Sequence, residues 1–288
     1  MSLINNSILM LKKTNKAPLI EYIFDTLNLL VPGIHNILKR RNKMNLFSKS
    51  RMLVRVLALS ILVAILIGCG FGASVPWIRN ADNNQVVNIG DSIFALSGEI
   101  QEYLHSYAGQ TFRRYSVTGA EITGGVMAPS IRSQYETARG DDPNIDIIFM
   151  DACGNDILIP ALAFDPYKCK TRRGELSSRC KDLIDDLYVE SVDLLNDMYA
   201  DGVENVIWQG YYYPKDSWLM KLDCMAEAID YGDMRLLQAC QNSAMNTTFI
   251  DTRWTVNDSD IKTDAIHPKR SGSKKLADLM WPVLEPLL

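Results

Sequence analysis

A short apolar segment runs into a tight polar turn in the sequence Val86-Val87-Asn88-Ile89-Gly90-Asp91-Ser92. The β-branched residues predict a buried strand over 86–89, and Gly-Asp-Ser is typical of a turn that ends a strand. Similar apolar runs recur downstream and alternate with longer segments of helical periodicity. This alternation is typical of strand and helix units around a parallel sheet. The sequence therefore predicts an α/β fold.

The same pattern predicts five strands and five main helices. The strands are Val86 to Ile89, Phe112 to Val117, Ile145 to Met150, Val203 to Trp208 and Thr247 to Ile250. Helices are expected near Gly98 to Tyr107, Val126 to Arg139, Leu176 to Ala200, Trp218 to Gln241 (broken at Asp230 to Asp233) and Ser271 to Leu284.

Polar residues follow four of the predicted strands. They are Gly90-Asp91-Ser92, Thr118-Gly119, Cys153-Gly154-Asn155-Asp156 and Asp264-Ala265-Ile266-His267-Pro268. In an open parallel sheet the ligand site lies beyond the carboxyl ends of the strands, so these residues are expected at one edge.

Acyl transfer needs a nucleophile, a base and a group that orients the base. A serine hydroxyl is a weak nucleophile unless a base lies within hydrogen-bond reach. After residue 68 the histidines are His105, inside a predicted helix where packing explains it, and His267, on a loop. Asp264 lies three residues before His267, and one turn of chain can bring its carboxylate to the imidazole. We expect Ser92, Asp264 and His267 to be catalytic.

The tetrahedral intermediate of acyl transfer also needs hydrogen-bond donors for its negative oxygen. The backbone N–H groups of Ser92 and Gly119 and the side-chain amide of Asn155 are candidates. Each block alone has a structural explanation, since Gly-Asp-Ser and Asn-Asp are common in turns and Asp-x-x-His-Pro fits a helix cap. All four blocks occur in order, each after a predicted strand, and this order favours a catalytic site with an oxyanion hole over a purely structural explanation.

Together these blocks resemble those of the SGNH (GDSL-type) hydrolases over residues 86–288. The resemblance implies a three-layer α/β/α, flavodoxin-like fold with a five-stranded parallel sheet. It also implies that Ser92 is the nucleophile, that Gly119 and Asn155 belong to the oxyanion hole, and that Asp264 and His267 are the acid and the base of the triad. One departure is Cys153, which stands where the family's Gly-x-Asn-Asp block has its first glycine. The Gly-x-Ser-x-Gly signature of α/β-hydrolases is absent from the sequence.

Residues 1–68 resemble an extension that ends in a signal peptide. Lys49, Arg51 and Arg55 precede the apolar run Val56 to Ile67, and Leu66-Ile67-Gly68-Cys69 resembles a bacterial lipobox. This predicts lipid on Cys69, a tether over 69–85, and an exported, membrane-anchored lipoprotein of the cell envelope, on the periplasmic or outer-membrane side. The alternative is an uncleaved anchor helix. Translation from Met44 or Met52 would give a signal peptide of ordinary length; a cytoplasmic extension is the other reading.

The charge distribution bears on possible partners. Residues 1–68 hold ten Lys and Arg against two Asp and Glu, which leaves 20 against 32 in the rest of the chain, a net charge of −12. Such an acidic domain lacks the basic surface that holds a phosphate backbone, so we expect no nucleic-acid partner. We expect a monomer.

Five cysteines remain after Cys69. Cys169 and Cys180 flank a polar loop, and Cys224 and Cys240 lie on the two arms of the interrupted helix. We expect these two disulfides, although four cysteines allow three connectivities, and we expect Cys153 to be a free thiol. Neither a Cys-x-x-Cys pair nor clustered histidines support the rival interpretation as a metal site, so we expect no metal and no cofactor.

Tyr211 and Tyr212 follow the fourth strand and are expected to contact substrate, with core packing as the alternative. The predicted reaction is hydrolysis of carboxylic esters through an acyl-enzyme, on short acyl or acetyl esters of a small molecule or a cell-envelope glycan. The alternatives are a lysophospholipase or thioesterase for longer acyl chains, and a lipid-anchored binding module without turnover.

Overall fold

The computed structural model describes residues 74–288, apart from 126–127, 172–173 and 219. Within them, five parallel strands form one sheet: β1 (Asn83–Ile89), β2 (Phe112–Arg114), β3 (Ile147–Met150), β4 (Asn205–Gln209) and β5 (Thr247–Ile250). The strands lie in the order β2-β1-β3-β4-β5, the flavodoxin-like order of a doubly wound sheet. The predicted sheet is thereby confirmed.

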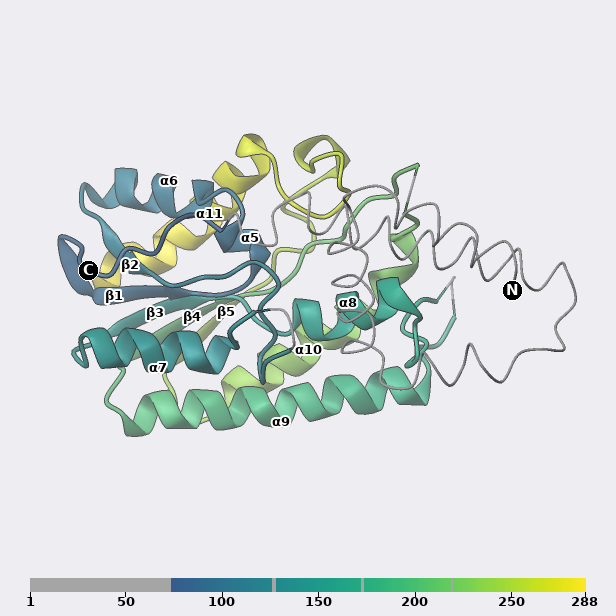
Figure 1. The fold of residues 1–288 in the computed structure, drawn as a ribbon, viewed down its shortest axis with the longest axis horizontal. Helices are drawn as coiled ribbons and strands as arrows, with labels where there is room; N and C mark the ends of the chain where they lie inside the picture. The colour runs from purple at the N-terminus through teal and green to yellow at the C-terminus, as the bar shows by residue number, and fades with distance from the viewer. Residues whose placement is uncertain (1–73, 126–127, 172–173, 219) are drawn as a thin grey trace, which may run out of the picture. The chain divides into compact units, whose positions relative to one another are not determined.

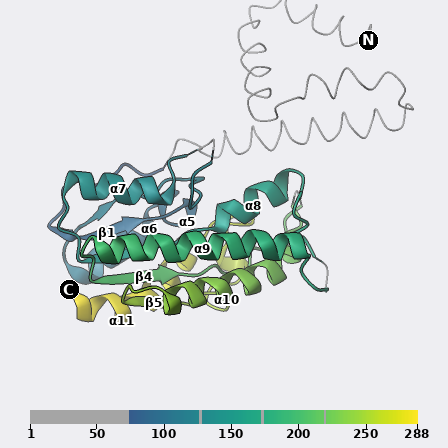
Figure 2. The same ribbon diagram turned by 90° about the horizontal axis from the view of Figure 1, so that it is seen from below.

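Helices cover both faces of this sheet (Figure 1). The helices α6 (Glu99–Ala108) and α11 (Arg270–Leu284) lie on one face, and α7 (Ile131–Asp141), α9 (Ser178–Ala200) and α10 (Ala226–Asn242) lie on the other. In Figure 2, which views the domain from below, α9 and α10 run side by side on the near side of the sheet. The shorter helices α5 (Ser92–Ala95) and α8 (Gly154–Ala163) begin at the carboxyl ends of β1 and β3. The predicted three-layer α/β/α architecture is confirmed.

The core is divided by the sheet because successive side chains of a strand point to opposite faces. In β3, Ile148 and Met150 belong to the apolar cluster under α7, α9 and α10, whereas Ile147 and Phe149 belong to the cluster under α6 and α11. Both faces of the strand are therefore buried, and this explains the continuous apolar run in the sequence.

Two helix starts follow from capping serines. The Ser130 hydroxyl accepts a hydrogen bond from Ser133 N at 2.9 Å, so α7 begins at Ile131. In the same way Ser177 accepts from Cys180 N at 3.1 Å and starts α9.

Two helix predictions were wrong. The fourth helix is not broken at 230–233: α10 is continuous from Ala226 and begins later than the predicted Trp218, after a 3₁₀ turn over Asp223–Met225. The buried Asp233 accepts a hydrogen bond from Tyr211 N, so a tertiary contact satisfies a residue that would otherwise favour a turn. Helix α8, which contains Pro160, was not predicted at all.

The domain begins earlier than residue 86. Strand β1 starts at Asn83, Ile78 pairs with Arg114 of β2, and Ser74 exchanges hydrogen bonds with Thr118. The described part of the predicted tether therefore packs on the sheet. The predicted signal region 1–68 and the lipidation residue Cys69 lie outside the described residues. Among the residues that are described, no helix has the length and apolar character to cross a bilayer.

One of the two predicted disulfides is present. Cys169 and Cys180 are bonded, with their Cα atoms 5.1 Å apart. The predicted bond between Cys224 and Cys240 is wrong, since these two cysteines are not bonded to each other. Because α10 is unbroken, it separates these residues by about 20 Å along its axis, whereas a disulfide needs Cα atoms within roughly 7 Å.

Candidate active site

The site lies where the sheet topology changes direction. From β1 the chain moves outward to β2 and then returns to β3 on the other side of β1, and such switch points form crevices at the carboxyl edge. Ser92 opens α5 after β1, and Asn155 lies in the first turn of α8 after β3. Both helices start at this edge in Figure 1. The topology thus brings the first and third sequence blocks together.

The three predicted catalytic side chains form one hydrogen-bonded chain. Ser92 Oγ lies 2.8 Å from His267 Nε2, although the two residues are 175 positions apart. His267 Nδ1 lies 3.0 Å from Asp264 Oδ2. This is the geometry in which an imidazole can take the serine proton while a carboxylate fixes its tautomer.

A tight turn holds the carboxylate against the imidazole. Asp264 Oδ1 accepts hydrogen bonds from Ile266 N at 3.0 Å and His267 N at 2.9 Å, and Ala265 has φ 72°, in the left-handed region. Burial raises the pKa of Asp264, but the hydrogen bond and charge of His267 and the two backbone N–H groups outweigh burial and lower the pKa to about 2. The group therefore remains a carboxylate at neutral pH.

The turn before Ser92 is held by two residues that the sequence interpretation did not single out. The Gln134 side chain of α7 accepts from Gly90 N at 2.8 Å and donates to Gly90 O at 3.0 Å. Asp151 Oδ1 accepts from Asp91 N at 2.6 Å. A Cβ on Gly90 would lie 2.1 Å from that Asp151 oxygen, so the turn requires glycine. Asp151 directly follows β3, and this position is the sequence signal that could have revealed it.

The candidate oxyanion residues lie in adjoining loops. Asn155 Nδ2 donates to Ala120 O at 3.0 Å, Asp156 accepts from Ile122 N, and Val117 N donates to Gly90 O at 2.9 Å. These bonds hold the loop that contains Gly119 between α8 and the turn formed by Gly90, Asp91 and Ser92. Gly119 has φ 80°.

Cys153 keeps the glycine-like conformation of the position it occupies. Its φ is 79°, although it carries a side chain, and it precedes α8 as the N-cap. The buried thiol is free and lies 3.6 Å from Ser191 Oγ. Burial raises the pKa of the Cys153 thiol well above its usual value, so it remains protonated.

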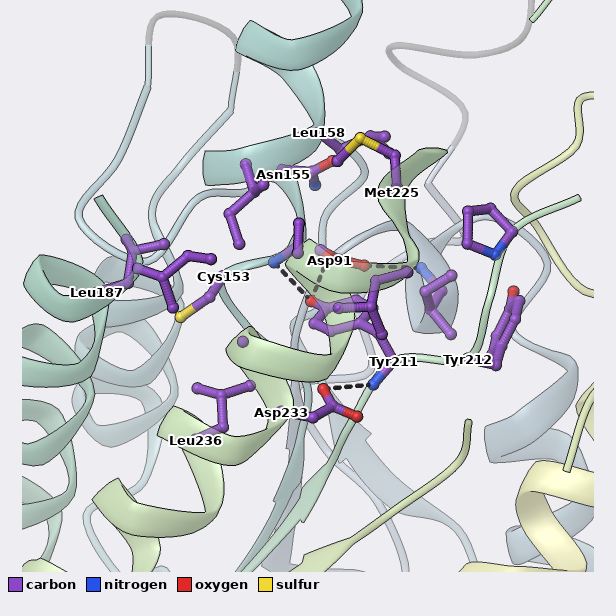
Figure 3. A pocket seen from close by; sticks show the side chains of 18 of the residues that line it. Asp91, Cys153, Asn155, Leu158, Leu187, Tyr211, Tyr212, Met225, Asp233 and Leu236 are labelled. Carbon is purple, nitrogen blue, oxygen red and sulfur yellow. Dashed lines mark hydrogen bonds between the residues drawn. The ribbon is translucent and has the colours of Figure 1, made fainter. Parts of the chain in front are cut away.

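Tyr211 and Tyr212 line a cavity together with Ser92 and Asn155, and their hydroxyl groups bind the protein, while the predicted contact with substrate stays a prediction. Tyr211 OH donates to Asp91 Oδ2 at 2.8 Å and accepts from Gly154 N at 3.0 Å. Tyr212 OH donates to Ile266 O at 2.6 Å, one residue before His267. Tyr211 therefore joins the nucleophile turn to the start of α8, as Figure 3 shows, and Tyr212 secures the histidine loop.

Buried carboxyl groups lie in and around the turn that leads to Ser92. Burial raises the pKa of both Asp91 and Asp151, and the neighbouring charge of Asp91 raises that of Asp151 further. Burial also raises the pKa values of Asp156 and Asp233 to about 7. Protons are thus retained around Ser92 to higher pH than carboxyls in water would allow.

His105 takes no part in this arrangement. Its Nε2 accepts from Phe112 N at 3.1 Å, and its ring packs on Phe112. Burial lowers the His105 pKa to about 4, so it remains neutral, in agreement with the predicted packing role. Across the described residues, no group of three or more His, Cys, Asp or Glu side chains has an arrangement that could hold a metal ion.

Comparison with known proteins gives only distant structural similarities. No protein-family model matches the sequence, nor does any curated protein. A GDSL-like lipase from Bacteroides thetaiotaomicron is 15% identical, with 73% of this chain and 93% of that one covered and a TM-score of 0.49. A family 3 carbohydrate esterase from Talaromyces cellulolyticus is 17% identical (70% and 96% covered, TM-score 0.47). An acetylxylan esterase from Geobacillus stearothermophilus is 16% identical (71% and 95% covered, TM-score 0.46).

Proposed function

We propose that this chain is a serine esterase that hydrolyses carboxylic esters through an acyl-enzyme on Ser92. The observation that carries the proposal is the hydrogen-bonded chain from Ser92 through His267 to Asp264, with distances of 2.8 Å and 3.0 Å. A nucleophile, a base and an orienting carboxylate from distant parts of the sequence meet at the sheet edge where ligands bind.

The reaction follows from these contacts. His267 Nε2 takes the proton of Ser92 Oγ as that oxygen bonds to the ester carbonyl carbon, and the carbon–oxygen bond to the alcohol then breaks as His267 returns the proton to the alcohol oxygen. Water then gives a proton to the same nitrogen and bonds to the acyl carbon. The bond from that carbon to Ser92 Oγ breaks as His267 returns the proton to Ser92 Oγ, which releases the carboxylic acid. Asp264, with its pKa lowered to about 2, stays ionised and stabilises the imidazolium.

Negative charge on the carbonyl oxygen needs donors aimed at it. The Asn155 amide, which is nearly buried and anchored to Ala120 O, is preorganised for this role together with the N–H groups of Ser92 and Gly119. A carboxylic ester of a small molecule or a glycan fits this chemistry without a metal or cofactor. The sequence alone favours a short acyl group.

The test is labelling and turnover by purified protein. Wild type should react with a fluorophosphonate probe at Ser92, whereas Ser92→Ala should not. Ser92→Ala and His267→Ala should each abolish turnover, and the double variant should be scarcely slower because the two residues act as one unit. Asn155→Ala should lose less, about 10²- to 10³-fold in kcat. Near wild-type hydrolysis by folded Ser92→Ala would refute the proposal, and absent labelling of wild type would favour a binding module.

We also propose that the protein is exported and anchored by lipid on Cys69. The lipobox-like sequence supports this, as does the Cys169–Cys180 disulfide, because such bonds persist mainly in oxidising compartments. Intact-mass analysis of membrane-extracted protein should find a mature chain that begins at an acylated Cys69. A chain that retains residues 1–68 would exclude lipidation and leave the anchor-helix alternative.

A further inference from the structure

A cavity of about 90 Å³ lies beside Ser92 and Asn155, between α8, α9 and α10 (Figure 3). One water needs only about 10–15 Å³ of such volume, so the cavity is several times larger than a hydration site. Because both Ser92 and Asn155 line it, the space is continuous with the proposed reacting group.

The walls of this cavity are mainly aliphatic. On one side Ala228, Ile229, Gly232 and Leu236 recur at helical spacing, which places them along one stripe of α10, and Met225 lies just before that helix. From Ala228 to Leu236 the stripe covers about 12 Å along the helix axis. Opposite it lie Ile157 and Leu158 of α8 and Ile184 and Leu187 of α9. An elongated apolar surface therefore leads away from the polar triad.

Gly232 keeps the middle of the stripe open. A Cβ built there would meet only Ile157 Cδ1, at 3.9 Å, so alanine would fit in ordinary contact. Glycine inside a helix is less stable than alanine, and the packing therefore gives no reason for glycine here. A large side chain at this position would instead extend into the cavity.

Charged groups along the cavity are held mainly by other groups of the protein, although Asp233 Oδ2 has no hydrogen-bond partner among the described residues. Asp233 Oδ1 accepts from Tyr211 N at 3.2 Å. The Arg235 guanidinium lies 4.0 Å from the Tyr188 ring centroid and pairs with Asp185 at 2.8 Å. These contacts leave the aliphatic side chains as the main surface for a ligand.

We propose that this cavity binds the acyl chain of the substrate, and that the preferred ester carries a straight acyl chain of octanoyl length or longer. The inference rests on the proposed esterase function. An acetyl group would leave the aliphatic stripe unused, whereas a longer chain would remove it from water. Each methylene that the cavity buries should raise kcat/KM about fourfold.

The first test is a chain-length series with the purified full chain. With 4-nitrophenyl acetate, butyrate, hexanoate and octanoate, kcat/KM should rise at each step. Octanoic acid, and not acetic acid, should protect Ser92 against the fluorophosphonate probe. A preference for acetate together with absent protection would overturn the acyl-chain site while leaving the esterase proposal intact. Absence of labelling and of turnover on every ester would instead overturn the esterase proposal, and with it the inference.

The second test uses a matched pair of variants. Gly232→Phe should lower kcat/KM for the octanoate ester at least about tenfold and leave the acetate ester within about twofold, because the ring fills the chain site without touching Ser92. Gly232→Ala should leave both esters unchanged. Equal losses on both esters in folded Gly232→Phe, judged by its melting temperature, would contradict the proposal. Should that variant not fold, probe protection in wild type decides the matter.

Discussion

The Tyr211 hydroxyl is where two separate turns of the site become one unit. It donates to Asp91, which precedes the nucleophile, and accepts from Gly154, which precedes Asn155. A Cβ on Gly154 would lie 2.5 to 2.7 Å from atoms of the Tyr211 side chain, so the glycine permits this approach. The separation between Ser92 and Asn155 therefore depends on a tyrosine whose hydroxyl is hydrogen-bonded to neither of these side chains.

Removing that hydroxyl should affect turnover more than binding. Tyr211→Phe keeps the ring but removes the hydrogen bonds to Asp91 and to the part-buried Gly154 N–H, a cost of about 1–3 kcal/mol. We expect kcat to fall about tenfold with KM within about twofold, measured by steady-state hydrolysis. Tyr213→Phe is the control, because its hydroxyl binds the exposed Asp230. A change in KM alone would indicate that Tyr211 contacts substrate rather than positions the turn.

Gln134 should matter for both stability and activity. Gln134→Met has similar volume but removes both hydrogen bonds to Gly90. Gly90 O keeps its hydrogen bond from Val117 N, but the buried Gly90 N–H loses its acceptor. This should lower the free energy of unfolding by about 1–3 kcal/mol, measured by urea denaturation, and kcat should fall with it. The exposed Glu136 of the same helix, changed to Met, should alter neither. Unchanged stability in Gln134→Met would show that water replaces the lost bonds.

At the scale of elements, errors arose where tertiary contacts override local preference. Asp230 is held by Tyr213 and Arg253, and Asp233 by Tyr211, so α10 continues through residues that predict a turn. Pro160 lies in the seventh position of α8, and this short helix is apolar with little periodicity, so nothing local identified it. The capped helices α7 and α9 were found because their cores repeat at helical spacing.

The disulfide at the start of α9 should contribute to stability through loop closure. Cys169 and Cys180 are 11 residues apart, and in the chain-entropy model a loop of this size is worth about 3 kcal/mol. Replacing both with serine should lower the melting temperature by about 6–12 °C. Dithiothreitol should lower that of wild type similarly and leave the double variant unaffected. If dithiothreitol lowered the melting temperature of both proteins equally, the loss of stability would not come from reduction of this disulfide.

For the whole molecule, the sheet and the hydrogen-bonded arrangement of Ser92, His267 and Asp264 could be predicted from the sequence. The contacts that hold the turn before Ser92 could not. Strands buried on both faces give continuous apolar runs, and parallel topology then places their polar carboxyl ends together. Gln134 and Asp151 act on Gly90 and Asp91 from elements distant in sequence, and no spacing rule connects such pairs. The misplaced Cys224–Cys240 bond followed from the misplaced helix break.

The buried carboxyls predict how stability depends on pH. Asp151 has a folded pKa well above the 3.8 of an unperturbed carboxyl, so its contribution is complete below about pH 4 and is lost as pH rises through the folded value. Asp156 and Asp233, whose pKa values are raised to about 7, change the stability with pH in the same direction. Asp264, at about 2, contributes above about pH 4 and loses its contribution as pH falls toward 2.

Urea midpoints should therefore fall as pH rises from about 4 through 7, and Asp151→Asn, which mimics the protonated acid, should show a smaller decline. The exposed Asp193 of α9, changed to Asn, should reproduce the wild-type profile. A profile that is flat for wild type, or equally steep for Asp151→Asn, would contradict the assignment.

The hydrogen bonds between Ser74 and Thr118 limit how far the catalytic edge could move from a bilayer. Thr118 precedes Gly119, so Ser74 is fixed next to the loop proposed to bind the oxyanion. If Cys69 carries lipid, five peptide units separate the bilayer surface from that contact, which is at most about 18 Å of extended chain. An esterase anchored in this way would work as an interfacial catalyst. Its effective substrate concentration would be set by the density of esters in the adjacent leaflet and not by their concentration in bulk solution.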